Sequence, residues 1–220
     1  MNGGRMKRHI LASFLVAFLV CAFSLQASAY TLLWDDYRPG TGVVDARKNP
    51  NNALHTTGEA DDYGSPTIST SDFTSLGFGG SIVLYLANNK AIANIAGDDF
   101  TVFETTGSAD THDYNPNKYP EHAEIYAFTG GLYDNEQDYA DSYWQSLGTI
   151  LQNGSLDLGL LSFTTAIKIV DVTTAGPSTD GFDVYGLGVN QVMPVPVPAA
   201  VWMLGSGLIA LLGIRRKMSV

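Results

Sequence analysis

Carboxylate side chains gather in three stretches of the sequence, and the chemistry that suits them is calcium binding. Calcium takes several carboxylate and carbonyl oxygens in a loosely defined geometry, often from loops. Asp134, Glu136 and Asp138 have the every-second-residue spacing that opens an EF-hand loop, and Asp141 follows them. The loop then departs from the EF-hand pattern because Tyr139 stands where the turn needs glycine. This stretch therefore has the right ligand types without a complete calcium motif.

The other two stretches hold the predicted calcium ligands, and calcium is the one cofactor that the residue types favour. These ligands are Asp98 and Asp99, which lie close to Glu104, and then Asp171, Asp180 and Asp183. A solvated acidic loop is the alternative interpretation of each set. A zinc site is not indicated, because no close H-x-x-x-H pair occurs.

Catalytic motifs are missing, so the sequence predicts a protein that is not an enzyme. No G-x-S-x-G elbow occurs, and Gly77-Phe-Gly-Gly80 lacks the spacing of a dinucleotide-binding loop. The only cysteine, Cys21, lies in an apolar N-terminal stretch. The alternative function is a secreted hydrolase acting on polysaccharide, with a carboxylate pair such as Glu104 and Glu124.

Aromatic residues suggest a different chemistry, the stacking of sugar rings. The candidates are Tyr114, Tyr119, Tyr133, Tyr139, Tyr143 and Trp144. Burial in the protein core is the alternative role for Trp144.

Short runs in which apolar and polar side chains alternate must position these residues. They predict an all-β fold, namely an antiparallel β-sandwich that is jelly-roll-like and carbohydrate-binding-like. Runs of five to eight residues rich in β-branched and aromatic side chains are separated by turn residues. The predicted strands are 81–87, 100–104, 123–128, 143–148, 166–172 and 181–189. The sandwich domain is predicted to span residues 30–189, with long loops at 35–72 and 107–121 and a linker at 190–194.

The N-terminus predicts a secretory signal peptide over residues 1–29. A basic start precedes an apolar run, and Ala27-Ser-Ala29 forms a small-x-small cleavage site, so we expect cleavage after Ala29. An uncleaved anchor is the alternative. The Sec export machinery would then be the first partner of the chain.

The charge of the exported part excludes nucleic acid as a partner. Between Tyr30 and Pro198, six basic residues stand against all 22 acidic ones, a formal net charge of −16. Such a surface repels phosphate backbones.

The C-terminal residues 195–220 combine a proline-rich start, an apolar run and a basic end. Residues 199–214 would form a single transmembrane helix of about 24 Å, short for the bilayer core but extended by snorkelling cations. The basic tail at 215–217 predicts a cytoplasmic C-terminus. The residues of this signal are Val195, Pro196, Val197, Pro198, Arg215, Arg216 and Lys217.

This tail resembles the sorting signal of PEP-CTERM proteins, whose pattern is Val-Pro-Glu-Pro, a membrane-spanning stretch and a short basic cluster. Val197 stands where that pattern has the acid. The resemblance implies that the chain is a substrate of an exosortase, held transiently in the inner membrane of a Gram-negative bacterium and then released to the cell surface or the extracellular space. It also implies a setting of exopolysaccharide and biofilm.

The middle of the chain resembles a β-sandwich domain of bacterial cell-surface proteins. The stretches SLGFGGSIVLYL, GDDFTVFE and GFDVYGLGV carry this resemblance. Asp183 matches the first Asp of that family's "GFDlD" line and Tyr185 replaces the second, while a final core strand is the alternative interpretation. We therefore expect an exported, non-enzymatic surface or matrix protein that binds extracellular polysaccharide or serves a structural role.

Overall fold

The chain folds into an antiparallel β-sandwich, seen in a computed structural model that describes residues 29–43, 45–57, 72–105, 121–151, 153–174 and 181–195. The larger sheet has the order β1-β3-β10-β6-β7, with β1 at Leu32–Arg38, β3 at Ser81–Leu86, β10 at Ala166–Asp171, β6 at His122–Phe128 and β7 at Trp144–Leu151. The second has the order β2-β11-β5-β8, with β2 at Thr74–Ser75, β11 at Asp183–Val189, β5 at Phe100–Glu104 and β8 at Gly154–Leu156.

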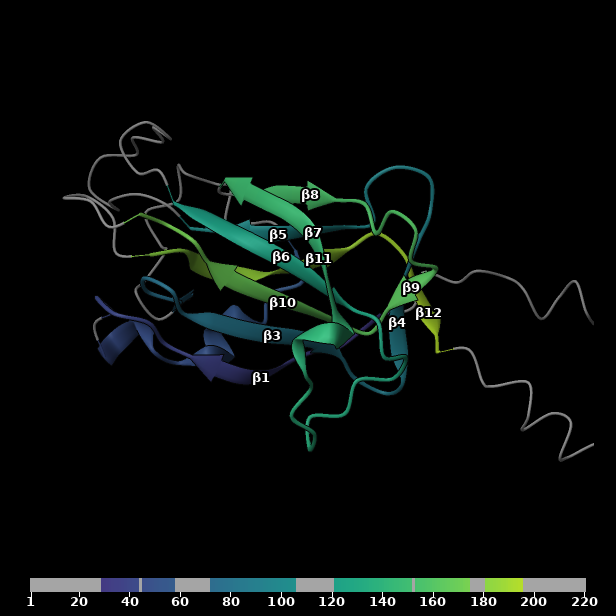
Figure 1. The fold of residues 1–220 in the computed structure, drawn as a ribbon, viewed down its shortest axis with the longest axis horizontal. Coiled ribbons are helices and arrows are strands. Elements are labelled where there is room, and N and C mark those ends of the chain that lie inside the picture. The colour runs from purple at the N-terminus through teal and green to yellow at the C-terminus, as the bar shows by residue number, and fades with distance from the viewer. Residues whose placement is uncertain are drawn as a thin grey trace, which may run out of the picture.

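A third, small sheet lies at one end of the sandwich, as Figure 1 shows. It has the order β12-β4-β9, with β12 at Val192–Pro194, β4 at Lys90–Ala93 and β9 at Phe163–Thr164. Three short 3-10 helices complete the described elements: η1 at Asp45–Arg47, η2 at Pro50–Ala53 and η4 at Asp141–Tyr143.

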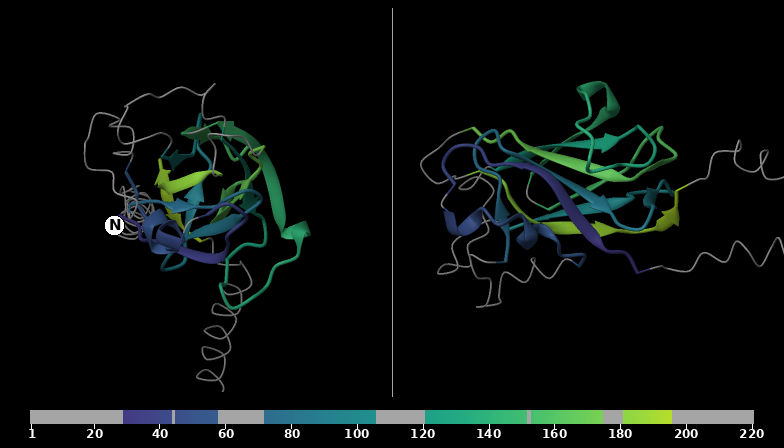
Figure 2. Two further views of the ribbon diagram at one scale, coloured as in Figure 1. Left: turned by 90° about the vertical axis from the view of Figure 1, so that its left-hand side faces the viewer. Right: turned by 90° about the horizontal axis from the view of Figure 1, so that it is seen from below.

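The two larger sheets enclose one hydrophobic core, because alternate side chains of each strand point to the same side. Ile82 and Leu84 of β3 and Ile167 and Ile169 of β10 are fully buried on the inner face of the five-stranded sheet. From the other sheet they meet fully buried Phe100, Val102, Val184 and Leu187. Figures 1 and 2 show the two sheets stacked face to face, as in other sandwiches.

The all-β sandwich prediction is confirmed, and six predicted strands match β3, β5, β6, β7, β10 and β11 within two or three residues. The predicted alternation in 100–104 is also confirmed, since Phe100, Val102 and Glu104 are all buried. GFDVYGLGV forms a core strand, β11, but this is not the final strand, because β12 follows it and buries Val192.

Two predicted irregular segments contain strands. β1 extends to Arg38, into the predicted loop, and pairs with β3. β12 occupies part of the predicted linker 190–194 and pairs with β4 through Val192, Met193 and Pro194. The linker prediction is corrected accordingly: proline at the end of an edge strand costs no ladder hydrogen bond, so a proline-rich stretch can still join a sheet.

Among the residues that the structure describes, no helix is long and apolar enough to cross a membrane. The predicted helix 199–214, Ala27, Pro196 to Pro198 and the basic residues 215–217 lie outside the described residues.

Candidate functional site

Asp99 is a structural residue in this fold. Its side chain is fully buried before β5. Oδ1 accepts the backbone N–H of Ile95 at 2.7 Å, and Oδ2 accepts that of Leu158 at 2.8 Å. Both oxygens therefore hold loops together, while neighbouring Asp98 is exposed to solvent.

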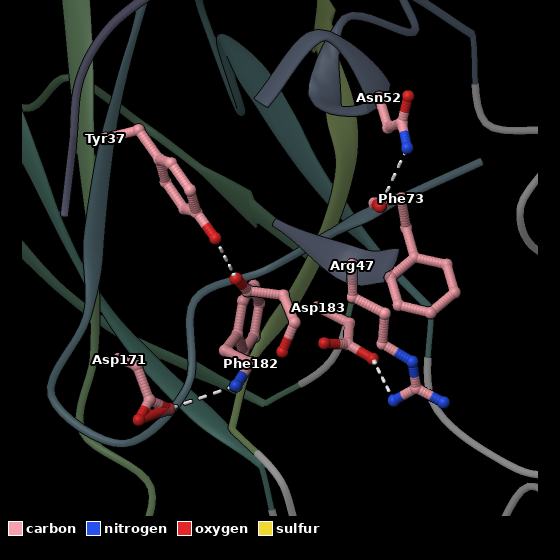
Figure 3. Close-up of polar contacts among 8 residues, drawn as sticks. Tyr37, Arg47, Asn52, Phe73, Asp171, Phe182 and Asp183 are labelled. Atoms are coloured by element: carbon pink, nitrogen blue, oxygen red, sulfur yellow. Dashed lines mark hydrogen bonds and ion pairs between the residues drawn. The ribbon is translucent and has the colours of Figure 1, made fainter. Parts of the chain in front are cut away.

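Asp171 has a similar task at the opposite end of the sandwich. Its Oδ1 accepts the N–H group of Phe182 at 3.1 Å (Figure 3). The same oxygen accepts the N–H of Thr173 at 3.2 Å, and Oδ2 accepts that of Gly79 at 3.2 Å. Gly181 beside this contact has φ +100°, and a Cβ there would lie 2.5 Å from Gly77 Cα. The carboxylate thus joins three chain segments that only glycine allows to approach so closely.

Asp183 lies in a buried polar cluster near Asp171, and Figure 3 shows its carboxylate directed at Arg47. The Arg47 Nη1 to Asp183 Oδ2 distance is 3.8 Å, and the guanidinium lies 5.2 Å from the Phe73 ring centroid. Tyr37 donates its hydroxyl to the Ser75 carbonyl at 2.7 Å. Burial, and then the nearby Asp183 charge, raise the pKa of Tyr37 to about 12.

Calcium binding stays a prediction. In the described ranges, no group of three or more His, Cys, Asp or Glu side chains is placed to hold a metal ion. Asp180 lies outside these ranges. The oxygens of Asp99 and Asp171 already accept backbone N–H groups, so they have limited capacity left for a metal.

The predicted carboxylate pair Glu104 and Glu124 does not share a cleft. Glu104 is 3% exposed and lies on the core side of β5, in the four-stranded sheet. Glu124 lies on the outer face of β6, where it accepts the Ser146 hydroxyl at 3.0 Å. Because the two side chains lie on opposite sides of the five-stranded sheet, they cannot act as an acid–base pair.

A groove of about 320 Å³ lies elsewhere, on the outer face of the five-stranded sheet. It lies between β1 and residues 129–143, which we call the covering segment. Figure 2, right, shows the 3-10 turn of this segment standing away from the sandwich. The lining residues are Asp35, Asp36, Arg38, Val83, Tyr133, Asn135, Glu136, Gln137, Asp138, Tyr139, Asp141, Trp144 and Lys168.

A β-bulge in β1 supplies one wall of the groove. Asp35 pairs with Val83 and Arg38 with Ser81, so β1 carries one extra residue between them. Asp36 has φ +44° at this point. Two consecutive side chains, Asp35 and Asp36, therefore line the groove, and Tyr37 returns to the core.

Aromatic side chains form the floor and the other wall. Tyr133 of the covering segment packs against Phe128, with ring centroids 5.3 Å apart and an edge-to-face geometry. Tyr139 packs on the same ring at 4.6 Å, and Trp144 at 5.3 Å. The Lys168 ammonium lies 5.7 Å from the Trp144 ring centroid. This second, smaller hydrophobic cluster fixes the covering segment on the sheet.

Polar contacts hold the first part of the covering segment in place. Tyr133 donates its hydroxyl to Asp35 Oδ2 at 2.7 Å and its backbone N–H to Thr165 Oγ1 at 2.9 Å. The Thr165 hydroxyl donates to the Gly131 carbonyl at 2.7 Å. Burial, and then the Asp35 carboxylate, raise the pKa of Tyr133 far above its usual range. Tyr133 therefore stays a neutral hydrogen-bond donor at any physiological pH.

The groove unites residues that the sequence analysis treated separately. Glu136, Asp138 and Asp141 from the acidic stretch line it together with Tyr133, Tyr139 and Trp144 from the aromatic set. Asp134 instead accepts the Glu136 N–H at 3.0 Å, and Tyr143 is 45% exposed outside the groove. Tyr114 and Tyr119 lie outside the described residues.

Sequence reasoning missed four charged lining residues: Asp35, Asp36, Arg38 and Lys168. The first three lie at the start of the predicted loop 35–72. The alternating LLWDDYR pattern is broken at its second aspartate, and this interruption was the available signal of a bulge.

The fold and the groove together define a β-sandwich domain with a ligand-sized surface site, since binding pockets begin at about 300 Å³. No protein-family model matches the sequence, and no curated protein matches it either. Among solved structures, the fold is similar to the family 32 carbohydrate-binding module of Streptococcus pneumoniae EndoD. The identity is 13% and the TM-score is 0.43, over 73% of this chain and 95% of that one.

Two further solved structures are similar. The allantoicase of Saccharomyces cerevisiae has 10% identity and a TM-score of 0.46, over 76% of this chain and 46% of that one. The family 32 module of C. perfringens NanJ, solved in complex with galactose, has 14% identity and a TM-score of 0.32, over 77% and 97%. Likenesses at these scores carry no argument, so the sandwich assignment rests on the strand pairing itself.

Proposed function

We propose that this domain is a non-enzymatic carbohydrate-binding module and that a glycan occupies the groove on its outer face. One observation carries the proposal: aromatic rings and several charged side chains converge on one groove of about 320 Å³. A sugar presents an apolar C–H face and a rim of hydroxyl groups. The face suits half-buried Tyr139 and Trp144, and the hydroxyls suit carboxylate acceptors and cationic donors.

The groove is prepared for a ligand by the contacts that hold its walls. The covering segment is fixed by Tyr133 and Thr165, and the opposite wall belongs to a strand of the sheet. A site built on such fixed elements loses little conformational entropy on binding.

Glycan binding is tested by affinity electrophoresis against a panel of neutral and charged polysaccharides, followed by calorimetry with oligosaccharides of the best one. Tyr139→Ala and Trp144→Ala are expected to weaken binding roughly two- to tenfold each, the usual value of an aromatic contact. Tyr185→Ala is the matched control, because Tyr185 lies on β11 of the other sheet and stacks on His55. Retention by no polysaccharide at all would reject the proposal.

Incubation of the protein with the same polysaccharides tests the hydrolase alternative. Five carboxylates line the groove, so the polysaccharide is also assayed for new reducing ends. A shortened polysaccharide would favour the hydrolase over the binding module.

We also propose that the chain is exported and then sorted through its C-terminal signal by an exosortase, with a transient stay in the inner membrane before it reaches the surface or the matrix. The sequence patterns of residues 1–29 and 195–220 support this. Two structural facts fit it. Tyr30, the first residue after the predicted cut, hydrogen bonds to Leu187 and Val189, and β12 ends at Pro194, just before the signal.

Intact mass of the protein from its own host, measured by compartment, tests the sorting proposal. Loss of the first 29 residues and of the chain beyond about Pro198 is the expected result. A protein that keeps residues 199–220 in the membrane fraction would contradict sorting and leave the tail as an anchor.

A further inference from the structure

The charges around the groove restrict the kind of glycan that it can hold, an inference that rests on the proposed glycan binding. Five carboxylates and two cations line the groove, which leaves it a formal charge of −3. The exported part of the chain has a net charge of the same sign. A uronate or sulfated polymer would therefore be repelled both at long range and in the groove.

Both cations of the groove are already engaged within the protein. Arg38 Nε lies 2.6 Å from Asp36 Oδ1, so this pair is neutral. The Lys168 ammonium lies over the Trp144 ring. Asp35 accepts the Tyr133 hydroxyl, which is a contact without charge neutralisation.

Three exposed carboxylates remain, all in the covering segment: Glu136, Asp138 and Asp141. None of the three forms a salt bridge with a described residue. Their positions beside Tyr139 and Trp144 place negative charge along the rim of the aromatic wall. A ligand that stacks on these rings would therefore have its substituents among carboxylates.

We propose that the groove selects a cationic amino sugar, that is, a glycan whose pyranose rings carry free amino groups. The ammonium group provides three hydrogen-bond donors and a positive charge, and it matches the three carboxylates of the rim. The apolar ring face contacts Tyr139 and Trp144 as in any glycan. The N-acetylated form of the same sugar keeps the ring contact and loses the charge, so it binds more weakly.

The expected preference follows from exposed ion pairs. One such pair changes affinity by about 1.4- to fivefold, so two or three of them give a preference on the order of tenfold. Because these charges are exposed, the preference must fall with salt. The Debye length decreases from about 30 Å at 0.01 M to about 3 Å at 1 M ionic strength.

The experiment compares a glucosamine hexamer with an N-acetylglucosamine hexamer, which have the same backbone, by calorimetry with the exported chain at low and high salt. The amine form is expected to bind about tenfold tighter at low salt and about equally at high salt. Equal or weaker binding of the amine form at low salt would overturn the inference and leave glycan binding intact. If neither hexamer and no polysaccharide of the panel binds, the proposed function itself is rejected.

Two triple variants separate local recognition from general attraction of a cation to an acidic protein. The first, Glu136→Gln with Asp138→Asn and Asp141→Asn, neutralises the rim and should abolish the preference while N-acetylglucosamine binding is kept. The second removes the same number of exposed charges outside the groove: Asp45→Asn, Asp98→Asn and Asp157→Asn. It should keep the preference. Equal losses in the two variants would mean diffuse attraction and would overturn the inference.

Discussion

The bond between Tyr133 and Asp35 joins the covering segment to β1 across 98 residues of sequence, and its removal is the sharpest test of how the groove is built. Tyr133→Phe removes one hydroxyl and leaves the ring, which packs on Phe128 and Tyr139. The change therefore isolates the hydrogen bond from the hydrophobic contact.

The magnitude follows from the environment of the two groups. A hydrogen bond to a charged group contributes about 1.5–3 kcal/mol, and Tyr133 is only 8% exposed. Asp35 lines the groove and can regain water there, so we expect a loss of about 1–2 kcal/mol. For a domain of this size, that loss lowers the unfolding midpoint by about 2–8 °C.

Urea unfolding measures the global loss, and amide hydrogen exchange measures local opening of the covering segment. The informative amides are those of Tyr133, bonded to Thr165, and of Thr129, bonded to the Tyr143 carbonyl. Both should exchange faster in the variant even if the segment opens without unfolding the sandwich. Tyr143→Phe is the matched control, because its hydroxyl makes no hydrogen bond with a described residue.

A double-mutant cycle with Asp35→Asn assigns the effect to the pair. The coupling energy should account for most of the loss in Tyr133→Phe. Unchanged stability together with unchanged exchange in Tyr133→Phe would falsify the view that this contact holds the groove wall.

Three further predictions concern the rest of the fold. Asp99→Ala should cost about 2–4 kcal/mol in urea unfolding, because the buried Leu158 N–H and the partly buried Ile95 N–H lose their acceptor. Chelation of divalent ions should leave the unmodified protein unchanged, and an equal effect of chelation would indicate that Asp99 holds a metal. Gly181→Ala should lower the unfolding midpoint more than Gly97→Ala. Both glycines have positive φ, but only Gly181 lies against the Gly77 backbone. Equal decreases of the midpoint in the two variants would rule out this close approach as the cause. The free energy of unfolding should fall between pH 10 and about 12, because the Tyr37 hydroxyl loses its proton at lower pH in the unfolded state than in the folded state. Unfolding curves across this range should therefore depend less on pH for Tyr37→Phe than for the unmodified protein. The same dependence in both proteins would contradict the raised pKa of Tyr37.

Local sequence was enough for six longer strands of the two larger sheets. In β5 the buried residues Phe100, Val102 and Glu104 alternate with half-buried ones, and a period of two in one short run is visible without any partner strand. The short strands β2, β8 and β9 have two or three residues each, too few for a period. Their identity depends on the neighbour that supplies their hydrogen bonds.

The candidate site was only half visible in the sequence. The acidic and aromatic residues between Tyr133 and Trp144 stood out by type, yet their types alone suggest two separate roles, calcium binding and sugar stacking. Asp99 and Asp171 looked like metal ligands, because nothing local reveals that their oxygens also accept N–H groups from residues 11 to 92 positions away.

The sequence by itself determined the class of the fold and the longer strands β3, β5, β6, β7, β10 and β11, because side-chain alternation is a property of the chain alone. Only the tertiary structure decided where the groove lies. It required the register of β1 on β3, whose bulge turns Asp35 and Asp36 to the same side, and the return of the covering segment onto the Phe128 ring. Both depend on contacts between residues far apart in sequence, which the pattern of any one segment does not specify.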